Sequence, residues 1–587
     1  MKSFFKNLLS SFLGALIAGI ILLFIGLGII SSLIPSKEKP IVKDNSVLVI
    51  KFENEIVDRA STNPFDDFDI STMQPNKKMG LNQILNVLDH AKTNPKIEGI
   101  LLHFTNFSAG AATIEEIRDE LELFKSSGKF IYAYSDFYSQ GSYYLASIAD
   151  KVFLNPQGLV EFRGLTAEIM FYKKALEKLE LEPVIIRGSN NKFKSAVEPF
   201  MYEQMSDASR EMTQVYLNSI WNHILTSISK SRNISVEELN QYANLMKVKN
   251  PNACVELKLI DSLVYYDEVL DILKNKTGIK DDENLHSINF NRYKKSFKRP
   301  HNPNRIAVIY AAGTIDMGEG ASDGIGSEKL SAQIRSARKN KEVKAIVVRI
   351  NSPGGSALAS EVIWREMELA KKEKPLIVSF GDVAASGGYY IACNADTILA
   401  SPTTITGSIG VFGVLFNAKK LLNNTLGITI DTVKTNAHSD IGSFTREMTE
   451  DEYLVIQEEV DRIYLDFKQH VAKGRSLDVE YVDSIGQGRV WSGASGLNNG
   501  LVDMDGGLKK AIEIAADKAG LKNYSILELP KQEDPFKEIF KDILNNQAQI
   551  VTQEFTETYK LVLKVEEILK MKGIQARPAF DIVVKGL

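Results

Sequence analysis

A serine placed between a strand-like run and a helix-like run is the first residue with the setting of a nucleophile. Gly381–Tyr390 reads GDVAASGGYY, and Ser386 lies where the apolar run gives way to the helical one. At a helix N-terminus, unpaired N–H groups and the helix dipole favour the negative charge that forms when a hydroxyl attacks a carbonyl. Gly387 would let the backbone approach a substrate closely. On the motif alone, the alternative is a helix-capping serine in a glycine turn. Ala384 stands where an α/β-hydrolase nucleophile elbow has glycine, so that fold is not expected.

A glycine pair follows another predicted strand. Asn351–Ser356 reads NSPGGS directly after the apolar run KAIVVRI. Two glycines at a strand end can present backbone N–H groups to an oxyanion. The alternative is a Pro-Gly turn with no chemical role.

A serine nucleophile also needs a general base. None of the seven histidines stands in a triad context, although His438 is the hardest of them to dismiss. The other candidate is a lysine in NKFKSAVEPF: Lys194, with Lys192 as the near alternative. A lysine must be neutral to act as a base, and burial beside apolar groups lowers its pKa from about 10.4. On this chemistry alone, Lys194 could equally be a solvated surface lysine.

The elements that position these residues belong to an internal duplication. Residues 97–156 align without gaps on residues 343–402, and 17 of the 60 positions are identical. Within the second copy, short apolar runs (IAVIYAAG, KAIVVRI, PLIVSF) alternate with amphipathic stretches such as ASEVIWREMELAKKE. This alternation predicts βαβ units and a mostly parallel sheet covered by helices.

The two copies differ selectively at the chemical positions. The first copy has TNFSAG in place of NSPGGS, and Gln140 in place of Ser386. When NKFKSAVEPF is aligned with NAHSDIGSF, each ahead of an REM triplet, Lys194 falls opposite Ser439. One copy keeps the lysine and the other keeps the serine. The pattern therefore predicts a single site assembled from both halves.

Composition and charge limit the classes of function and structure that remain possible. The net charge is −4, which gives no reason to expect nucleic acid as a partner. Only Cys254 and Cys393 are present, which excludes a disulfide scaffold and a cysteine-rich metal site. The run Leu8–Ile34 is uncharged and longer than the roughly 20 residues that span a bilayer, so we expect an uncleaved anchor rather than a signal peptide. The flanking lysines weakly favour a cytoplasmic N-terminus.

Taken in order, four motifs resemble those of the signal peptide peptidase A (protease IV) family in its long, duplicated, membrane-anchored form. The motifs are KSAVEPF from Lys194, NSPGGS, AASGGYY and TGSIGVFG from Thr406. The resemblance implies tandem ClpP/crotonase-like α/β domains preceded by one transmembrane helix, and a Ser/Lys-dyad serine endopeptidase. The roles it implies are Ser386 as nucleophile, Lys194 as general base, Ser408 as the residue that orients the lysine, and Gly354 and Gly387 as oxyanion donors.

The same resemblance implies a setting. It implies a homotetramer on the bacterial cytoplasmic (inner) membrane, single-pass, with the catalytic body on the outer or periplasmic side, degrading cleaved signal peptides. Apolar peptides would then be the substrates, and neither a metal nor a cofactor is expected. Two alternatives remain open: a non-catalytic, membrane-anchored oligomeric scaffold of the same fold, and an acyl-CoA enzyme of crotonase type.

The predicted organisation has five parts. These are the anchor 1–36, the first domain 45–277 that supplies the lysine, a polar linker 278–304, the second domain 305–529 that supplies the serine, and a C-terminal helical extension 530–587. For the extension, packing on its own subunit is favoured over a contact between subunits.

Overall fold

A computed structural model describes residues 11, 13–14, 16–21, 39–61, 68–69, 74–75, 78–280, 282–298, 301–321, 324–532, 573–577 and 584–585. Most of the predicted anchor 1–36 lies outside these residues, as does the amphipathic part of the C-terminal extension. Within the described residues, no helix is both long enough and apolar enough to cross a membrane. The anchor therefore stays a prediction.

The first copy forms a parallel sheet of six strands in the order β11-β8-β7-β6-β1-β12. The strands are β1 (Ser46–Phe52), β6 (Ile97–Phe104), β7 (Phe130–Tyr138), β8 (Lys151–Val160), β11 (Ser262–Leu263) and β12 (Ser287–Asn289). Their centres are continuous buried apolar runs, as expected for a parallel sheet covered on both faces.

The second copy repeats this ladder as β23-β19-β18-β16-β13-β24. The strands are β13 (Arg305–Ala312), β16 (Val343–Ser352), β18 (Leu376–Ala385), β19 (Thr397–Ala400), β23 (Met504–Asp505) and β24 (Ser525–Leu529). β20 (Ile405–Gly407) and β22 (Val490–Ser492) extend the sheet beside the end of β18. The strands β6, β7 and β8 keep one constant sequence offset to β16, β18 and β19, so that β6 begins at Ile97 and β16 at Val343. The duplication and its parallel sheets are confirmed.

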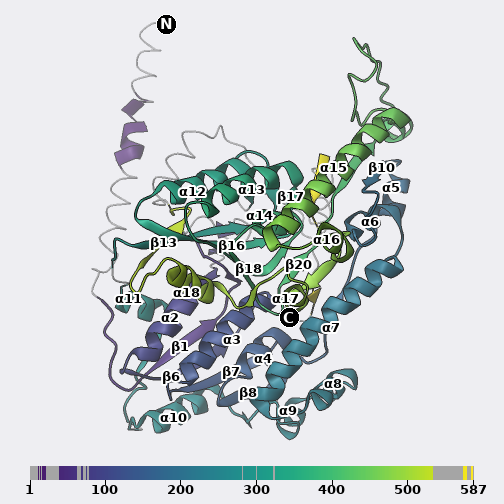
Figure 1. Cartoon of the computed structure of the whole chain (residues 1–587). Coiled ribbons are helices and arrows are strands. Elements are labelled where there is room, and N and C mark those ends of the chain that lie inside the picture. Colours follow the sequence, from purple (N-terminus) through teal and green to yellow (C-terminus); the bar gives the residue numbers. More distant parts are fainter. Residues whose placement is uncertain are drawn as a thin grey trace.

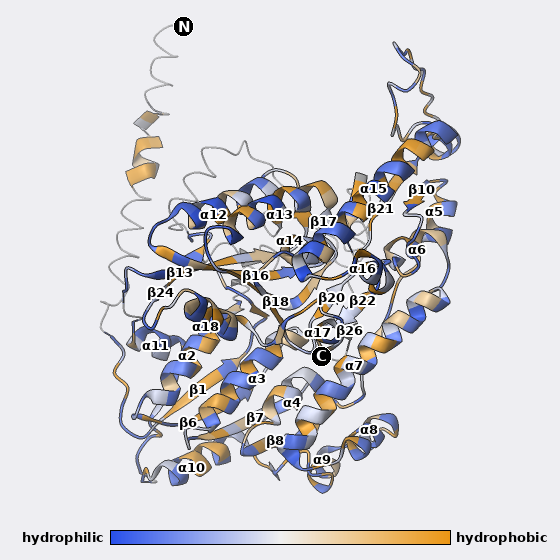
Figure 2. Cartoon of the chain, in the orientation of Figure 1, coloured by the Kyte–Doolittle hydropathy of each residue, from blue (hydrophilic) through white to orange (hydrophobic). Residues whose placement is uncertain are grey.

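Helices cover both sheets, and Figure 1 shows the two copies stacked, with the first below the second. The helices that cover equivalent positions are α2 (Leu81–Thr93) and α12 (Ser327–Lys339), α3 (Ala111–Lys125) and α13 (Ala357–Lys371), and α4 (Gln140–Ala146) and α14 (Gly387–Ala392). The others are α5 (Lys173–Lys178), α6 (Glu198–Met201), α7 (Asp207–Arg232), α8 (Val236–Asn244), α9 (Pro251–Glu256), α10 (Tyr266–Thr277), α11 (Phe290–Ser296), α15 (Glu450–Arg475), α16 (Val479–Ile485), α17 (Gly493–Asn498) and α18 (Leu508–Lys518). Apolar residues gather on the strands and polar ones on the outer helix faces (Figure 2).

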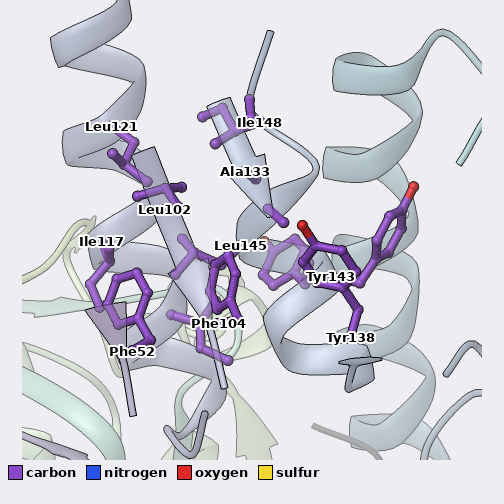
Figure 3. Packing of buried hydrophobic residues seen from close by; sticks show 14 of the residues in the cluster. Phe52, Leu102, Phe104, Ile117, Leu121, Ala133, Tyr138, Tyr143, Leu145 and Ile148 are labelled. Atoms are coloured by element: carbon purple, nitrogen blue, oxygen red, sulfur yellow. The ribbon is translucent and has the colours of Figure 1, made fainter. Parts of the chain in front are cut away.

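Aromatic side chains fill the core of the first copy. Phe52 and Phe104 stack with ring centroids 5.1 Å apart, and Tyr138 contacts Phe104 from the next strand. Figure 3 shows these rings with Leu145 and Ile117, which come from the helices on that face of the sheet. The first copy therefore keeps a large core, to which Ile405 and Val490 of the second copy also contribute, although it lacks the serine.

A buried ion cluster joins the two copies. Arg349 on β16 is fully buried, and its Nε donates to the Asp58 carboxylate of the first copy at 2.7 Å. Its Nη1 donates to Ser379 Oγ and to the Phe380 carbonyl on β18. A buried guanidinium holds its charge only when such partners surround it. Through Arg349, Asp58 thus connects the first copy to β16 and β18, the two strands that precede NSPGGS and Ser386.

A third sheet mixes the halves in the order β10-β21-β25-β17-β14-β15. Its strands are β10 (Glu182–Arg187), β14 (Ile315–Asp316), β15 (Ile325–Gly326), β17 (Gly355–Ser356), β21 (Phe412–Asn417) and β25 (Gly573–Ala576). β10 comes from the first half and pairs antiparallel with β21 of the second. Because of this pairing, the residues that follow β10 lie against the second copy.

The segment 278–304, predicted as a polar linker, contains ordered elements. β12 pairs with β1, and α11 packs beside it through the buried residues Phe290 and Tyr293. β12 occupies in the first sheet the place that β24 occupies in the second. The charged residues that indicated a linker lie before β12 and in and after α11, on either side of these buried residues. The first copy therefore extends further than its predicted end at 277.

Candidate active site

Ser386 lies in the turn between β18 and α14 with φ 55° and ψ −114°, a conformation that residues with a Cβ seldom adopt. Backbone bonds hold it there: its N–H donates to the Gly407 carbonyl at 2.8 Å, and its own carbonyl accepts from the Tyr390 N–H at 2.8 Å. Its hydroxyl makes no capping bond to α14. The alternative of a helix-capping serine does not describe this structure.

The Ser386 hydroxyl meets Lys194 of the other half. The Lys194 Nζ lies 2.9 Å from Ser386 Oγ, 3.0 Å from Ser408 Oγ and 3.2 Å from the Ser408 carbonyl oxygen. Lys194 is 1% exposed, and both serines are fully buried. The structure therefore brings together the predicted nucleophile, base and supporting serine from both copies.

Burial lowers the pKa of Lys194 well below its usual value, and the positive charge of Arg577 lowers that pKa further. Among the described residues, the hydrogen-bond partners of Nζ are hydroxyl and carbonyl oxygens rather than carboxylates, so these hydrogen bonds do not offset the cost of a buried charge. A neutral Nζ has a lone pair with which to accept the Ser386 proton. The pair thus has the spacing that a serine nucleophile and a lysine base require.

Backbone contacts with the second copy fix the segment that carries Lys194. The Phe193 N–H donates to the Gln487 carbonyl at 2.9 Å, and the Asn191 side-chain amide donates to the Val411 carbonyl at 2.9 Å. Gly488, at φ +80°, lies so close to Lys194 that a Cβ there would come within 2.5 Å of the lysine Cβ. Only glycine fits that position, and the close contact holds the base of the lysine side chain in place.

Apolar side chains surround the lysine segment. Ala196 and Val197 pack with Phe412 and Val414 of β21 in one buried cluster. Phe412 also places its ring centroid 5.9 Å from the Lys194 Nζ. These residues form the apolar wall that the KSAVEPF motif predicts, and they account for the desolvation of Nζ.

The two predicted oxyanion glycines lie side by side at this site. A Cβ added to Gly354, which has φ +96°, would lie 2.6 Å from the Gly387 nitrogen. Gly387 begins α14, where an N–H has no partner within the helix. The Gly354 N–H instead donates to Ser352 Oγ at 3.1 Å. Gly387 therefore has the better geometry for a donor, while Gly354 provides the space beside it.

The first copy has no equivalent site. Gln140 begins α4 at the position of Ser386, and its Oε1 accepts from the N–H groups of Arg163 and Gly164, both at 2.9 Å. At the sequence offset that relates the copies, the buried ring of Phe162 takes the place of Ser408. A buried amide and a ring replace the reactive hydroxyls.

The two other base candidates lie elsewhere. Lys192 is exposed, with its Nζ over the ring of Phe193. His438 is bonded at 3.3 Å to Glu452, at the start of α15. Neither contact involves Ser386.

The C-terminal strand β25 and the adjoining Arg577 were not predicted near the site. β25 pairs antiparallel with both β17 and β21. A four-residue strand carries too little periodicity to be detected in a sequence, and pairing partners so distant in sequence leave no local signal.

Comparison with known proteins finds two family models that match the chain. The family model for Peptidase family S49 matches residues 123–280 and 368–522, one segment in each half. The family model for Clp protease matches residues 300–406, which include both Gly354 and Ser386. The fold and site define a duplicated, ClpP-like α/β serine protease.

Curated relatives carry the same assignment over most of the chain. The chain is 38% identical to Protease 4 of Salmonella typhi over 457 residues, covering 76% of this chain and 73% of that one. It is 32% identical to the chloroplastic serine protease SPPA of Arabidopsis thaliana, covering 91% of this chain and 78% of that one. Protease 4 of Haemophilus influenzae is 35% identical, with 75% and 73% covered. The chain belongs to Peptidase family S49.

Proposed function

We propose that this serine protease degrades cleaved signal peptides at the membrane through a Ser386–Lys194 dyad. The 2.9 Å approach of Lys194 Nζ to Ser386 Oγ, in a buried setting without a carboxylate partner, is the observation that carries the proposal. The non-catalytic scaffold and the crotonase-type acyl-CoA enzyme would need neither a buried lysine nor a strained serine, and membership of a peptidase family argues against both.

The mechanism follows from the contacts. Neutral Lys194 takes the Ser386 proton as Oγ attacks the peptide carbonyl, and the Gly387 N–H stabilises the oxyanion. Protonated Lys194 then gives its proton to the leaving amine. A water attacks the acyl-enzyme with Lys194 again as base, which regenerates the serine. The Ser408 hydroxyl and carbonyl orient Nζ throughout.

Extended apolar peptides suit the surroundings of the dyad. β17 and β21 flank the site, and each pairs antiparallel with the extended strand β25, which shows that their backbone groups suit an extended chain. The apolar cluster of Ala196, Val197, Phe412 and Val414 lies along β21. Signal peptides contain an apolar stretch, which suits an apolar groove. An anchor in residues 1–36 would hold the enzyme next to them, with its body on the outer or periplasmic side of the bacterial inner membrane.

One exposed surface could form the contacts between the subunits of the proposed homotetramer. The segment 421–449 projects from the body ahead of α15 (Figure 1). It exposes several large apolar residues to solvent: Leu426, Ile428, Ile430, Val433, Ile441 and Phe444. Exposed apolar residues in such number are typical of a contact between subunits.

Peptide hydrolysis in detergent tests the proposed substrate class. The full chain should cleave a synthetic signal-peptide hydrophobic region much faster than a polar peptide of equal length, as followed by mass spectrometry. Lys194→Ala and Ser386→Ala should be inactive on both. Equal rates on the two peptides would contradict the proposed substrate class but leave the protease assignment intact.

A further inference from the structure

The helix α3 of the first copy begins without a capping side chain of its own. Its N-cap residue is Gly110, which has no side chain to accept a hydrogen bond from the first turn. In the second copy the equivalent helix α13 begins after Ser356, whose Oγ accepts from the Ala359 N–H at 3.3 Å. The sequence offset that relates the copies aligns Gly110 with Ser356 and Thr113 with Ala359. The first copy therefore lacks a cap that the second copy makes for itself.

Asp382 of the second copy supplies the missing cap. Its Oδ1 accepts from the Thr113 N–H at 3.0 Å, and its Oδ2 accepts from the Thr113 hydroxyl at 2.8 Å. A Cβ added to Gly110 would clash with the Asp382 carboxylate. The carboxylate thus fills the space of the absent side chain, and it bonds the N–H that aligns with the one capped by Ser356.

Asp382 lies in a bulge of β18, shortly before Ser386. At this bulge the residues Gly381–Val383 of β18 lie opposite the single residue Asn351 of β16. The side-chain oxygen of Asn351 accepts from the Val383 N–H at 3.1 Å, and Val383 packs on the core of the first copy. A bulge bends its strand and redirects the residues that follow. Asp382 and Val383 therefore anchor on the first copy the part of β18 that leads into Ser386.

We propose that Asp382 is a positioning residue, which caps α3 in place of Gly110 and thereby fixes the end of β18 and the turn that carries Ser386. Ser386 Oγ lies 2.9 Å from Lys194 Nζ, and this approach depends on the direction of that turn. A misplacement of about 1 Å in a reacting group can lower a rate about 10²-fold. For its effect on the rate, the inference rests on the proposed Ser386–Lys194 dyad, whereas the capping does not.

Moving the cap from one copy to the other tests the capping. In the full chain, Asp382→Ala should lower the Tm because α3 loses its cap. Gly110→Ser should also lower the Tm, because the added side chain clashes with Asp382. The double variant Gly110→Ser/Asp382→Ala has both a cap and the room for it, so its Tm should exceed that of either single variant. A double variant with a Tm no higher than those of the single variants would overturn the proposal.

Kinetics on an apolar fluorogenic peptide separate positioning from stability. Asp382→Ala should lower kcat about ten-fold with little change in KM. In the double variant kcat should stay equally low, because the new cap holds α3 but not β18. Recovery of kcat together with the Tm would overturn the proposal. If Asp382→Ala does not fold, the double variant is compared with wild type instead, and a wild-type kcat there has the same consequence.

Two further variants are the controls. Asp382→Asn keeps an acceptor for the Thr113 N–H and should retain most of kcat, so an equal loss in Asp382→Asn and Asp382→Ala would contradict positioning through these contacts. Asp136 aligns with Asp382 but is exposed and accepts from the Tyr134 hydroxyl and the Asn155 amide. Asp136→Ala should leave kcat unchanged, and an equal loss there would contradict a role specific to Asp382.

Hydrogen exchange followed by mass spectrometry separates this proposal from the proposed function, because it needs no substrate. Residues 383–390 should exchange faster than in wild type in both Asp382→Ala and the double variant. Residues 111–117 should exchange faster only in Asp382→Ala, since the double variant caps α3 again. Wild-type exchange over 383–390 in both variants would overturn the proposal. If wild type cleaves no peptide, the proposed function fails, and the exchange of 383–390 still decides whether Asp382 holds the turn of Ser386.

Discussion

Gln140 and Ser386 occupy aligned positions at the starts of the equivalent helices α4 and α14, yet the amide of Gln140 is bonded to backbone and the hydroxyl of Ser386 faces a lysine. Gln140 Oε1 accepts two backbone N–H groups, whereas the Ser386 hydroxyl lies 2.9 Å from Lys194 Nζ. The contacts of Gln140 indicate a structural role in the first copy, whereas we propose a chemical role for Ser386 in the second. Gln140→Ala should therefore lower stability by about 1–3 kcal/mol by leaving buried donors unpaired. Its kcat on a peptide substrate should be unchanged, and a large loss of kcat in a folded variant would contradict a purely structural role.

Ser408→Ala should lower kcat while the protein stays folded. The Ser408 hydroxyl is one of the three oxygens within 3.2 Å of Lys194 Nζ, and without it the amine is less well aimed at Ser386. We expect a fall on the order of 10–100-fold in kcat with little change in KM. Ser401→Ala is the control, since Ser401 is equally buried but bonded to Thr403. Equal kcat in the two variants would remove Ser408 from the mechanism.

Gly354→Ala should abolish most activity. The residue has φ +96°, and a Cβ there would crowd the Gly387 nitrogen at 2.6 Å, next to where the oxyanion forms. A loss of about 10²–10³-fold in kcat is expected for a disturbed oxyanion site. Gly128→Ala introduces the same kind of backbone strain at φ +83°, where nothing lies within 4 Å of the added Cβ. Activity lost equally in both variants would point to general strain rather than to the site.

The buried lysine should make stability depend on pH. Burial lowers the pKa of Lys194 in the folded chain, so the unfolded chain binds the extra proton over the range between the lowered pKa and the usual one of about 10.5. Stability therefore rises with pH across that range, and at lower pH the folded protein bears the cost of burying the charge. Lys194→Met should raise the Tm, and by more at pH 6 than at pH 9. A Tm difference independent of pH would contradict a depressed lysine pKa.

Arg349 should be essential for the packing of the two copies against each other. Arg349→Met leaves the Asp58 carboxylate buried without its partner, which for a buried pair costs about 3–5 kcal/mol. Because Arg349 also bonds Ser379 and the Phe380 carbonyl on the strand that leads to Ser386, activity should fall together with stability. Urea denaturation compared with wild type measures the loss, and a variant of unchanged stability would show that the cluster does not hold the copies together.

Much of this site could be predicted from the sequence because the two copies can be compared with each other, position by position. The offset between the copies exposes the exchange of Gln140 for Ser386, and a long apolar run leads into each turn. The contacts that deliver Lys194 leave no such trace: Gly488 and Asn191 act through backbone proximity between segments far apart in the chain. For the same reason β25 could not be predicted from the sequence. Its four residues are placed at the site only by their pairing with β17 and β21. The charged segment 278–304 was interpreted as a linker because its polar residues outnumber short apolar anchors such as Phe290 and Tyr293.

The dyad itself is tested most directly by the pH dependence of kcat/KM in wild type and three folded variants. The detergent-solubilised full chain, Lys194→Ala, Lys192→Ala and Ser386→Ala would be compared on one apolar fluorogenic peptide from pH 6 to 10. Wild type and Lys192→Ala should share a rising limb whose midpoint lies well below the usual lysine pKa of about 10.4. Lys194→Ala should fall to the background rate of Ser386→Ala at every pH. Substantial activity in Lys194→Ala would contradict a catalytic site assembled from the two halves.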